Sequence, residues 1–456
     1  ADGLGASLEL AQTTGLSTQE QGKWYNWQGS TEYGGTPGAA GSGPFGVVIN
    51  EVLTNTQGQP GDLDDAIELL NTTTSSVDLT GWHLSDSIED PFKFAIPAGT
   101  SIAAGQYLVF DEDDFDFGLN GIRGDSVWLV KRDAAEGIAL FGDEIAFGGT
   151  RPGESLGRIP DGSGRLTPLE QRSLGSANIT PRVGPLFISE IQYNPVASEI
   201  ALETEPFLED SDLEFIEIHN PSDATVSLTG WRLRGGADYN FDDNTPIADG
   251  QSLVIVKFNP DAPDNANRTA AFKQHYGIGD DVTLLGGYTG QLNNGGDRVQ
   301  LVRMLSSAGD DVHRVQEDEV LFDDLPTWPT AADGTGFSLQ RIGNDTLGND
   351  SSSWFAGQAN PGSTFDGVPG DFDDNRVVNA ADIDLLFAET RQEDPDSRFD
   401  LTGDGQVNED DRNRMIKGIL ATSFGDSNLD GIFNSSDLVQ VFQNGKYEEG
   451  LVGSAG

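Results

Sequence analysis

The hexapeptide Leu79-Thr80-Gly81-Trp82-His83-Leu84 occurs again, with one substitution, as Leu228-Thr229-Gly230-Trp231-Arg232-Leu233. In both places a Thr-Gly pair precedes a short run in which large apolar residues alternate with polar ones. This pattern predicts a half-buried β-strand after a turn. One large aromatic residue at a fixed strand position usually fills a core, so we expect Trp82 and Trp231 to lie at the centres of two domains.

The repetition continues on both sides of the hexapeptide. The interval from Glu68 to Trp82 equals that from Glu217 to Trp231, which aligns two copies of one domain. Each copy consists of short β-branched or alternating runs separated by Gly, Pro, Asn and Asp turns, which predicts an all-β sandwich. The other matched segments are Ile49-Asn50-Glu51-Val52 with Ile188-Ser189-Glu190-Ile191, Ile67-Glu68-Leu69-Leu70-Asn71 with Ile216-Glu217-Ile218-His219-Asn220, residues 104–109 with 249–254, and residues 124–129 with 296–301.

The order of these segments resembles the lamin tail domain, an immunoglobulin-like sandwich. The resemblance covers residues 45–181 and 182–365, which we expect to be the first and second sandwich. It implies a fold and a context, because bacterial members decorate large secreted and surface proteins as interaction or structural modules. The family has no shared catalytic residues to transfer.

The ends of the two copies also recur at the start of the chain. Gly153-Glu154-Ser155-Leu156-Gly157-Arg158-Ile159 and Gly336-Phe337-Ser338-Leu339-Gln340-Arg341-Ile342 both match Gly5-Ala6-Ser7-Leu8-Glu9-Leu10. Trp27 with residues 34–38 likewise resembles Trp354 with residues 360–362. We therefore expect residues 1–44 to be the closing part of a preceding β repeat, from a cleaved or longer protein. The alternative is a glycine-rich extension with chance similarity.

The second copy carries an insertion that the first lacks. Residues 265–276 predict a short helix that ends at Gly277. Insertions in sandwich loops often carry binding functions, but no partner follows from these residues.

A twelve-residue pattern occurs three times in the tail, at residues 371–382, 400–411 and 426–437. Oxygen-bearing side chains stand at positions 1, 3, 5, 9 and 12, position 7 offers a backbone carbonyl, and position 6 is Gly405 and Gly431 in the later copies. Hard cations that take six to eight oxygens require such alternation, and Ca²⁺ is the usual occupant. The alternative is a set of solvated acidic loops. The predicted ligands are Asp371, Asp373, Asn375, Val377, Asn379 and Asp382; Asp400, Thr402, Asp404, Gln406, Asn408 and Asp411; and Asp426, Asn428, Asp430, Ile432, Asn434 and Asp437.

Apolar residues at i, i+3, i+4 spacing predict a helix after each loop, with Met415, Ile416, Ile419 and Leu420 after the second. The order of loop then helix resembles a dockerin, a calcium-folded module that docks onto a cohesin partner. The resemblance lies in residues 425–431 and 434–438, and it assigns partner contacts to loop positions 10 and 11. This tail departs from the family in having three loops, Arg376 at a glycine position and the charged pair Glu409-Asp410. We expect residues 366–456 to form a small all-α, EF-hand-like domain with two to three calcium ions.

Composition excludes several classes of partner. The formal net charge is −49, which opposes binding to nucleic acid or to anionic membranes. The chain has no cysteine and no apolar run long enough to span a bilayer. Acidic calcium loops suit the extracellular medium, so we expect a secreted or cell-surface protein that starts at Ala1 as a mature or trimmed chain.

Catalytic motifs are weak. Gly153-Glu154-Ser155-Leu156-Gly157 fits a nucleophile elbow, but its serine recurs as Ser7 and Ser338 without the second glycine, so it belongs to the repeat. The four histidines form no zinc-type pair, and a glycosidase-like pair of carboxylates is not excluded by spacing. Further calcium sites are conceivable ahead of two equivalent strands, at Asp62, Asp64 and Asp65 and at Glu209, Asp210 and Asp212.

The sequence therefore predicts a mainly β protein, with tandem immunoglobulin-like sandwiches followed by a calcium-loop tail. We expect a non-enzymatic structural, adhesion or assembly protein, whose tail binds a cohesin-like domain or another copy of itself. Polysaccharide of the cell surface or matrix is a further expected partner. One alternative is the anchoring part of a larger secreted enzyme. The other is a carbohydrate-binding module, for which Tyr107, Trp128 and Tyr239 are the aromatic candidates.

Overall fold

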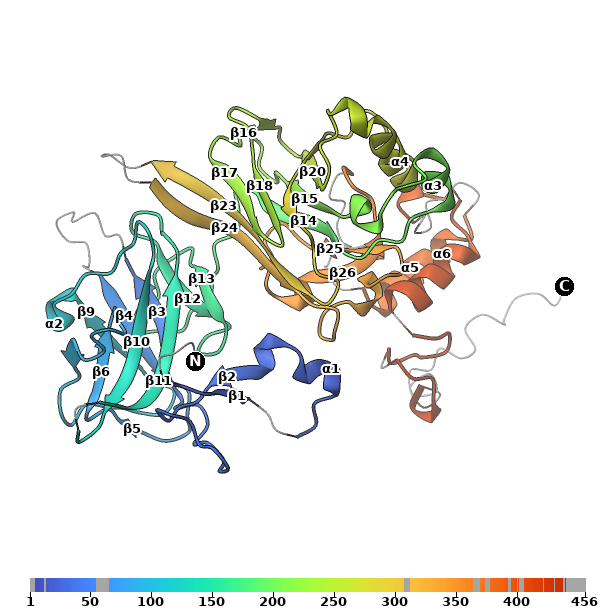
Figure 1. Ribbon diagram of the computed structural model, residues 1–456. Helices are drawn as coiled ribbons and strands as arrows, with labels where there is room; N and C mark the ends of the chain where they lie inside the picture. The colour runs from blue at the N-terminus through green and yellow to red at the C-terminus, as the bar shows by residue number, and fades with distance from the viewer. Residues whose placement is uncertain are drawn as a thin grey trace.

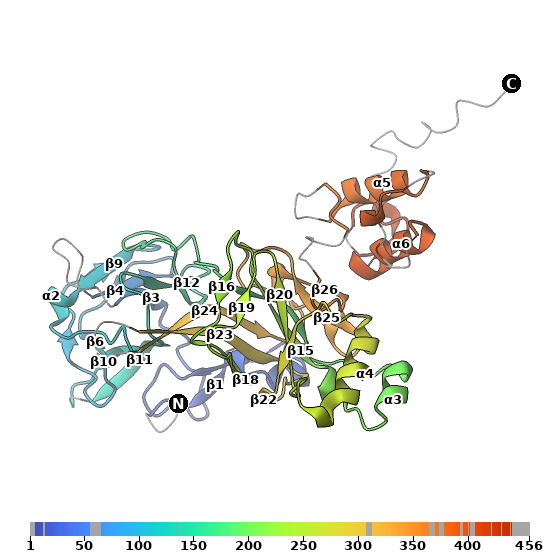
Figure 2. The ribbon, with the colours of Figure 1, turned by 90° about the horizontal axis from the view of Figure 1, so that it is seen from above.

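The computed structural model describes residues 5–11, 14–54, 65–135, 137–306, 312–363, 370–373, 378–392, 395–399, 401, 406–420, 422–429, 431–437 and 439. Two β-sandwiches lie side by side, with the N-terminal segment against both and the tail beside the second (Figure 1). A view from above shows the tail at the side of the second sandwich where β25 (Phe337–Arg341) and β26 (Trp354–Gln358) lie (Figure 2). No described helix is long and apolar enough to cross a membrane.

The first sandwich packs a five-stranded sheet against a four-stranded sheet. The larger sheet has the order β13-β12-β3-β4-β9 and the smaller one β11-β10-β6-β7, and all their pairings are antiparallel. Its elements are β3 (Val47–Leu53), β4 (Ala66–Asn71), β5 (Val77–Asp78), β6 (Trp82–Ser85), β7 (Phe94–Ala95), β8 (Ser101–Ile102), β9 (Tyr107–Asp111), α2 (Glu112–Phe115), β10 (Asp125–Arg132), β11 (Ile138–Phe147), β12 (Ser155–Ile159) and β13 (Arg165–Pro168).

The second sandwich repeats this plan with more strands. Its sheets have the orders β21-β20-β15-β14-β25-β26 and β22-β18-β17-β23-β24, and β21 adds to the first sheet in parallel. Its strands are β14 (Phe187–Gln192), β15 (Phe215–His219), β16 (Val226–Ser227), β17 (Trp231–Gly235), β18 (Ala237–Asn240), β19 (Pro246–Ile247), β20 (Ser252–Val256), β21 (Leu284–Gly286), β22 (Thr289–Gly290), β23 (Asp297–Ser306), β24 (Val312–Phe322), β25 (Phe337–Arg341) and β26 (Trp354–Gln358). Its helices are α3 (Glu199–Thr204), η2 (Asp210–Leu213), η3 (Pro263–Asn265), α4 (Ala266–Tyr276), η4 (Thr330–Ala332) and η5 (Ser351–Ser353).

The repeated tryptophan fills each core, as the sequence predicts. Trp82 belongs to the core of the first sandwich and Trp231 to that of the second, and both are almost completely buried. Gly81 and Gly230, just before them, have φ of 83° and 79°, a conformation that glycine adopts without strain. The Thr-Gly pair therefore makes the turn that aims each indole inward.

The insertion of the second copy forms the predicted helix. α4 ends at Gly277, whose φ of 66° gives the left-handed C-cap. Phe272 of α4 packs on Phe215 and Phe258 in a separate apolar cluster. The insertion thus covers one outer face of the sheet that contains β14, β15 and β20.

The N-terminal segment forms a hairpin that contacts both sandwiches. Its elements are β1 (Leu8–Leu10), α1 (Thr18–Gln21), η1 (Trp24–Asn26) and β2 (Trp27–Gly29). The Phe141 amide donates to the Thr31 carbonyl at 2.7 Å in the first sandwich, and Lys23 pairs with Asp323 at 2.9 Å in the second. The hairpin therefore bridges the two domains.

Buried ion pairs join the sandwiches directly. Glu317 of β24, whose side chain has no exposed surface, binds Arg151 of the first sandwich at 2.5 Å. It also binds Arg182, where the second sandwich begins, at 2.8 Å, and Arg182 in turn binds Glu154 of the first sandwich at 2.5 Å. Gly149 also forms a parallel bridge with Val315. Removing one partner of such buried pairs would leave an uncompensated charge, so the contact fixes how the domains meet.

The tail contains short helices around a small core. They are α5 (Ala380–Glu389), η6 (Ser397–Phe399), α6 (Glu409–Asn413) and the π-helix η7 (Arg414–Ile419). The apolar core comprises Phe372, Leu386, Phe399 and Met415. The guanidinium of Arg414 lies 4.3 Å from the ring centroid of Phe337, which places the tail against β25.

Candidate metal centre

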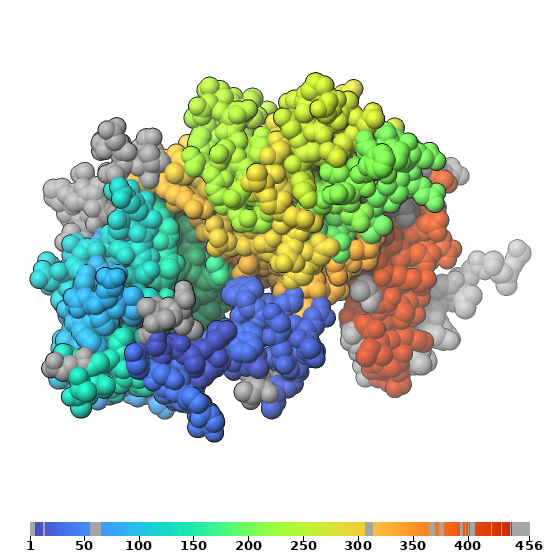
Figure 3. Space-filling model, in the orientation of Figure 1, coloured from blue at the N-terminus to red at the C-terminus, as the bar shows by residue number. Residues whose placement is uncertain are grey.

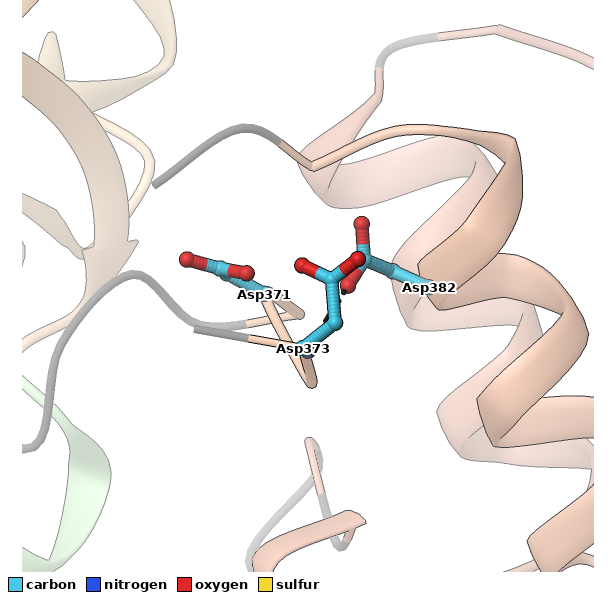
Figure 4. Close-up of side chains that lie close together, drawn as sticks. All are labelled: Asp371, Asp373 and Asp382. Atoms are coloured by element: carbon cyan, nitrogen blue, oxygen red, sulfur yellow. Dashed lines mark hydrogen bonds between the residues drawn. The ribbon is translucent and has the colours of Figure 1, made fainter. Parts of the chain in front are cut away.

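The first loop gathers three aspartates. Carboxylate oxygens of Asp371, Asp373 and Asp382 all lie within 4.8 Å of one another. Asp371 and Asp373 come from the segment before α5, and Asp382 from the first turn of α5 (Figure 4). Among the described residues, this is the one group of three acidic or histidine side chains close enough to share a metal ion.

Asp382 is buried and holds the loop closed. Its Oδ1 accepts the backbone N–H of Phe372 at 2.8 Å and that of Asp373 at 3.3 Å, and its Oδ2 accepts that of Asn379 at 2.9 Å. The side chain of Asn379 in turn accepts the amide of Ala381, which completes a capping box at the start of α5. One carboxylate therefore ties the beginning of the loop to the helix that follows it.

The third loop repeats this arrangement. Asp437 is buried, and its Oδ1 accepts the amides of Ser427 at 3.0 Å and Asn428 at 3.3 Å. Its Oδ2 accepts the amide of Asn434 at 2.7 Å. In two loops that are 55 residues apart, the position-12 carboxylate therefore accepts the backbone amides of the equivalent positions 2, 3 and 9.

Position 1 of the third loop is fixed as well. Asp426 accepts the amide of Gly431 at 2.8 Å across the loop, and it also accepts the hydroxyl of Thr422. Gly431 has φ of 86°, which explains why glycine suits the predicted sharp turn at position 6. The side chain of Asn434 donates to the Ile432 carbonyl at 3.1 Å, so the position-7 carbonyl faces the loop's own residues.

The second loop is described only at its end. Asp411 is buried, and its Oδ2 accepts the Asn408 amide at 2.7 Å, while the Asn408 side chain accepts the Asp410 amide. Gln406 is exposed. In the third loop the Asn434 side chain likewise accepts the Ser436 amide, so the same hydrogen bonds at positions 9 and 12 occur in all three loops. The predicted ligands Asn375, Val377, Asp400, Thr402, Asp404 and Asp430, with Arg376 and Gly405, lie outside the described residues.

The donor set fits a hard divalent cation. The three gathered side chains all offer carboxylate oxygens, and none offers sulfur or imidazole nitrogen. Three carboxylates this close repel one another in a chain of net charge −49, and a dication among them would remove that repulsion.

The acidic clusters predicted in the sandwiches are engaged differently. Asp212 accepts the amide of Glu209 at 3.1 Å and lies 3.0 Å from Arg268, and Asp210 accepts the amide of Ala197. Asp65 accepts the amide of Leu119 at 2.6 Å, whereas Asp62 and Asp64 lie outside the described residues. These carboxylates bind the protein's own donors and form no group of three among the described side chains.

Sequence reasoning missed a pair of glutamates inside each sandwich. Glu190 of β14 lies opposite Glu217 of β15, and Glu51 of β3 lies opposite Glu68 of β4, all of them buried. A register shift just before Glu190 and Glu51 turns both glutamates to the same face as their partners. The aligned copies have glutamate at both equivalent positions, and this repetition is the sequence signal that would have revealed the two pairs.

Each pair is covered by the loop that closes its sandwich. The amide of Gly362 donates to Glu217 at 2.6 Å, and the amide of Gly175 donates to Glu68 at 2.5 Å. Burial, together with the charge of Glu217, raises the pKa of Glu190 to about 8. Burial likewise raises the pKa values of Glu217 and Glu68 to about 7. Each pair therefore holds a proton near neutral pH.

The aromatic residues considered for carbohydrate binding belong to the sandwiches. Trp128 is buried, the Tyr107 hydroxyl donates to Asp161 at 2.7 Å, and Tyr239 packs edge-on against Phe241. These three side chains do not form an exposed row.

Comparison with known proteins agrees with the architecture. The model of the lamin tail domain matches residues 41–144 and 180–318, together more than half of the chain. The chain belongs to the lamin tail domain family. Its two lamin tail domains each include a closing hairpin, β12–β13 or β25–β26, that lies beyond the matched residues.

Other comparisons add little. A crystal structure of a DUF4876 family protein from Bacteroides thetaiotaomicron is 11% identical in sequence, and the alignment covers 70% of this chain and 94% of that one. Its TM-score is 0.24. No curated protein matches the chain.

Proposed function

We propose that this is a non-enzymatic extracellular assembly protein whose tail binds two to three calcium ions through its twelve-residue loops. The observation that carries the proposal is the cluster of Asp371, Asp373 and Asp382, whose carboxylate oxygens lie within 4.8 Å. The matching hydrogen bonds at Asp437 support a second site of the same design. Calcium would supply charge neutralisation there and would order the loops.

The remaining ligands would come from the predicted positions of each loop. Asn379 and Asn434 stand at position 9, where a side-chain oxygen or a bound water usually completes the coordination. Because the core formed by the described tail residues contains only four buried apolar side chains, we expect calcium to contribute much of the folding free energy of the tail.

Loops one and two pack their position-8 residues, partly buried, on the tail core, whereas loop three leaves its position-8 residue exposed. Val378 and Val407 pack on the tail core. Phe433, the equivalent residue of the third loop, is 54% exposed, and Ile432 beside it is 65% exposed. An exposed apolar pair on an ordered calcium loop suits contact with a partner, for which we propose the tail of another copy.

Light scattering on the purified chain tests the assembly role. With calcium we expect a mass above that of one chain, and with chelator the mass of one chain. The variant Phe433→Asp should remain monomeric while still binding calcium, and Leu202→Asp, at an exposed leucine of α3, should assemble normally. A monomer that binds calcium fully would instead favour a different partner, such as a cohesin-like domain, or an anchoring role in a secreted enzyme.

A further inference from the structure

The N-terminal hairpin has the same construction as the closing hairpin of the second lamin tail domain. Leu8 pairs with Gly29 and Leu10 with Trp27, in the register that joins Leu339 to Ala356 and Arg341 to Trp354. A single 3₁₀ turn precedes the second strand in both cases, as η1 and η5. The hairpin thus reproduces β25 and β26 strand for strand.

Side-chain contacts repeat in the same way. The Trp27 indole N–H donates at 2.8 Å to the carbonyl of Gln21, and that of Trp354 donates at 2.9 Å to Gly348, six residues upstream in both hairpins. The Thr36 hydroxyl donates to Glu9 at 3.3 Å, and at the equivalent positions the Gln340 side chain donates to Asn360 at 2.7 Å. The returning loop therefore covers the same face of each hairpin.

In the N-terminal hairpin, one edge has no neighbouring strand among the described residues and one face is exposed. The complete domains cover both the equivalent edge and the equivalent face. β12 lies between β13 and β3, and β25 lies between β26 and β14, but among the described strands β1 pairs only with β2. Leu8 is 60% exposed, whereas its equivalents Leu156 and Leu339 are 7% and 0% exposed. In Figure 3 the dark-blue hairpin lies on the molecular surface.

We propose that the open edge of β1 accepts, antiparallel, the first strand of another lamin tail domain. This chain shows the occupant twice, because β3 and β14 fill the equivalent place in the complete domains. Strand addition of this kind uses backbone hydrogen bonds for affinity and alternate side chains for specificity. The inference does not depend on calcium or on the proposed function of the tail.

The register specifies the side chains of the incoming strand. In the complete domain Ile191 lies opposite Leu339 and Glu190 lies opposite Gln340, which can donate to it. In β1 these positions are Leu8 and Glu9. The incoming strand should therefore carry an apolar residue opposite Leu8 and an amide or cationic residue, not a carboxylate, opposite Glu9.

Synthetic peptides of residues 186–194 provide the probe. Fluorescence anisotropy of the labelled peptide with the full chain measures affinity, and amide hydrogen exchange at Leu8 and Leu10 locates the binding. We expect the peptide with Glu190→Lys to bind about tenfold more tightly than the unchanged peptide, with Glu190→Gln between them. Affinity should be the same with calcium and with chelator.

Two variants test the contact and a third serves as the control. Leu8→Asp in the chain, and Ile191→Asp in the peptide, should each weaken binding at least about tenfold, whereas Leu202→Asp in α3 should not. Leu8 is exposed, so its replacement should leave the fold intact. Failure of all peptides to bind, binding unaffected by Leu8→Asp, or no slowing of exchange at Leu8 and Leu10 would overturn the proposal.

Discussion

Replacing Asp382 by alanine is expected to abolish calcium binding in the first loop and to unfold the beginning of α5. This carboxylate belongs to the cluster with Asp371 and Asp373 and also accepts the amides of Phe372, Asp373 and Asn379. Loss of the cap alone should cost about 1 kcal/mol of helix stability. Loss of a ligand charge should lower calcium affinity at that loop at least about 100-fold.

Isothermal titration with calcium measures this loss, and two further variants separate its causes. Asp384→Ala removes an exposed aspartate two residues along α5, so it should bind calcium like the unchanged chain. Asp382→Asn keeps the shape of the side chain but removes its charge, so it should also bind weakly. Equal affinities for Asp382→Ala and Asp384→Ala would show that the cluster is not a metal site.

The stability of the second lamin tail domain is expected to fall as the pH rises above about 5. Glu190 and Glu217 have raised pKa values in the folded protein, whereas an unperturbed glutamate titrates near 4.5. The folded chain therefore binds more protons than the unfolded chain between about pH 4.5 and 8, and stability contributed by the pair falls as pH rises through that window. We expect a loss on the order of 3 kcal/mol from pH 5 to pH 8.5.

Urea unfolding at several pH values, with calcium present and at high ionic strength, measures this loss. High salt is needed because the net charge of −49 produces a change of the same sign. Glu190→Gln imitates the protonated carboxyl and should flatten the pH dependence, while Glu199→Gln, on the first turn of α3, should leave it unchanged. A pH dependence identical in the two variants would contradict a shared proton at the pair.

The sequence predicted the β architecture because its signals were local and were repeated. The turn before Trp82 and Trp231, the alternation of the strands and the C-cap at Gly277 each depend on a few neighbouring residues. The pattern of Met415 and Ile416 predicted an α-helix, and the structure instead winds this segment as a π-helix directly after α6. Both side chains nevertheless remain buried, as the pattern required.

Contacts between distant segments could not be read from the sequence. In the sequence Glu217 is the polar residue of an alternating strand, whereas in the structure the loop at Gly362, 145 residues away, covers it. In the sequence Glu317 is one acidic residue among many, and only the fold brings Arg151 and Arg182 to it. In the tail, spacing identified Asp371, Asp373 and Asp382 as neighbours, but not the three amides that hold Asp382 in place.

Amide hydrogen exchange of the full chain, in calcium and in chelator, tests the central claim most directly. The account predicts that calcium protects the amides of Phe372 and Asp373, those of Ser427 and Asn428, and the helix α5, while both lamin tail domains exchange equally in the two conditions. Protection of the tail that is identical with and without calcium would contradict the claim that these loops bind calcium and order the tail.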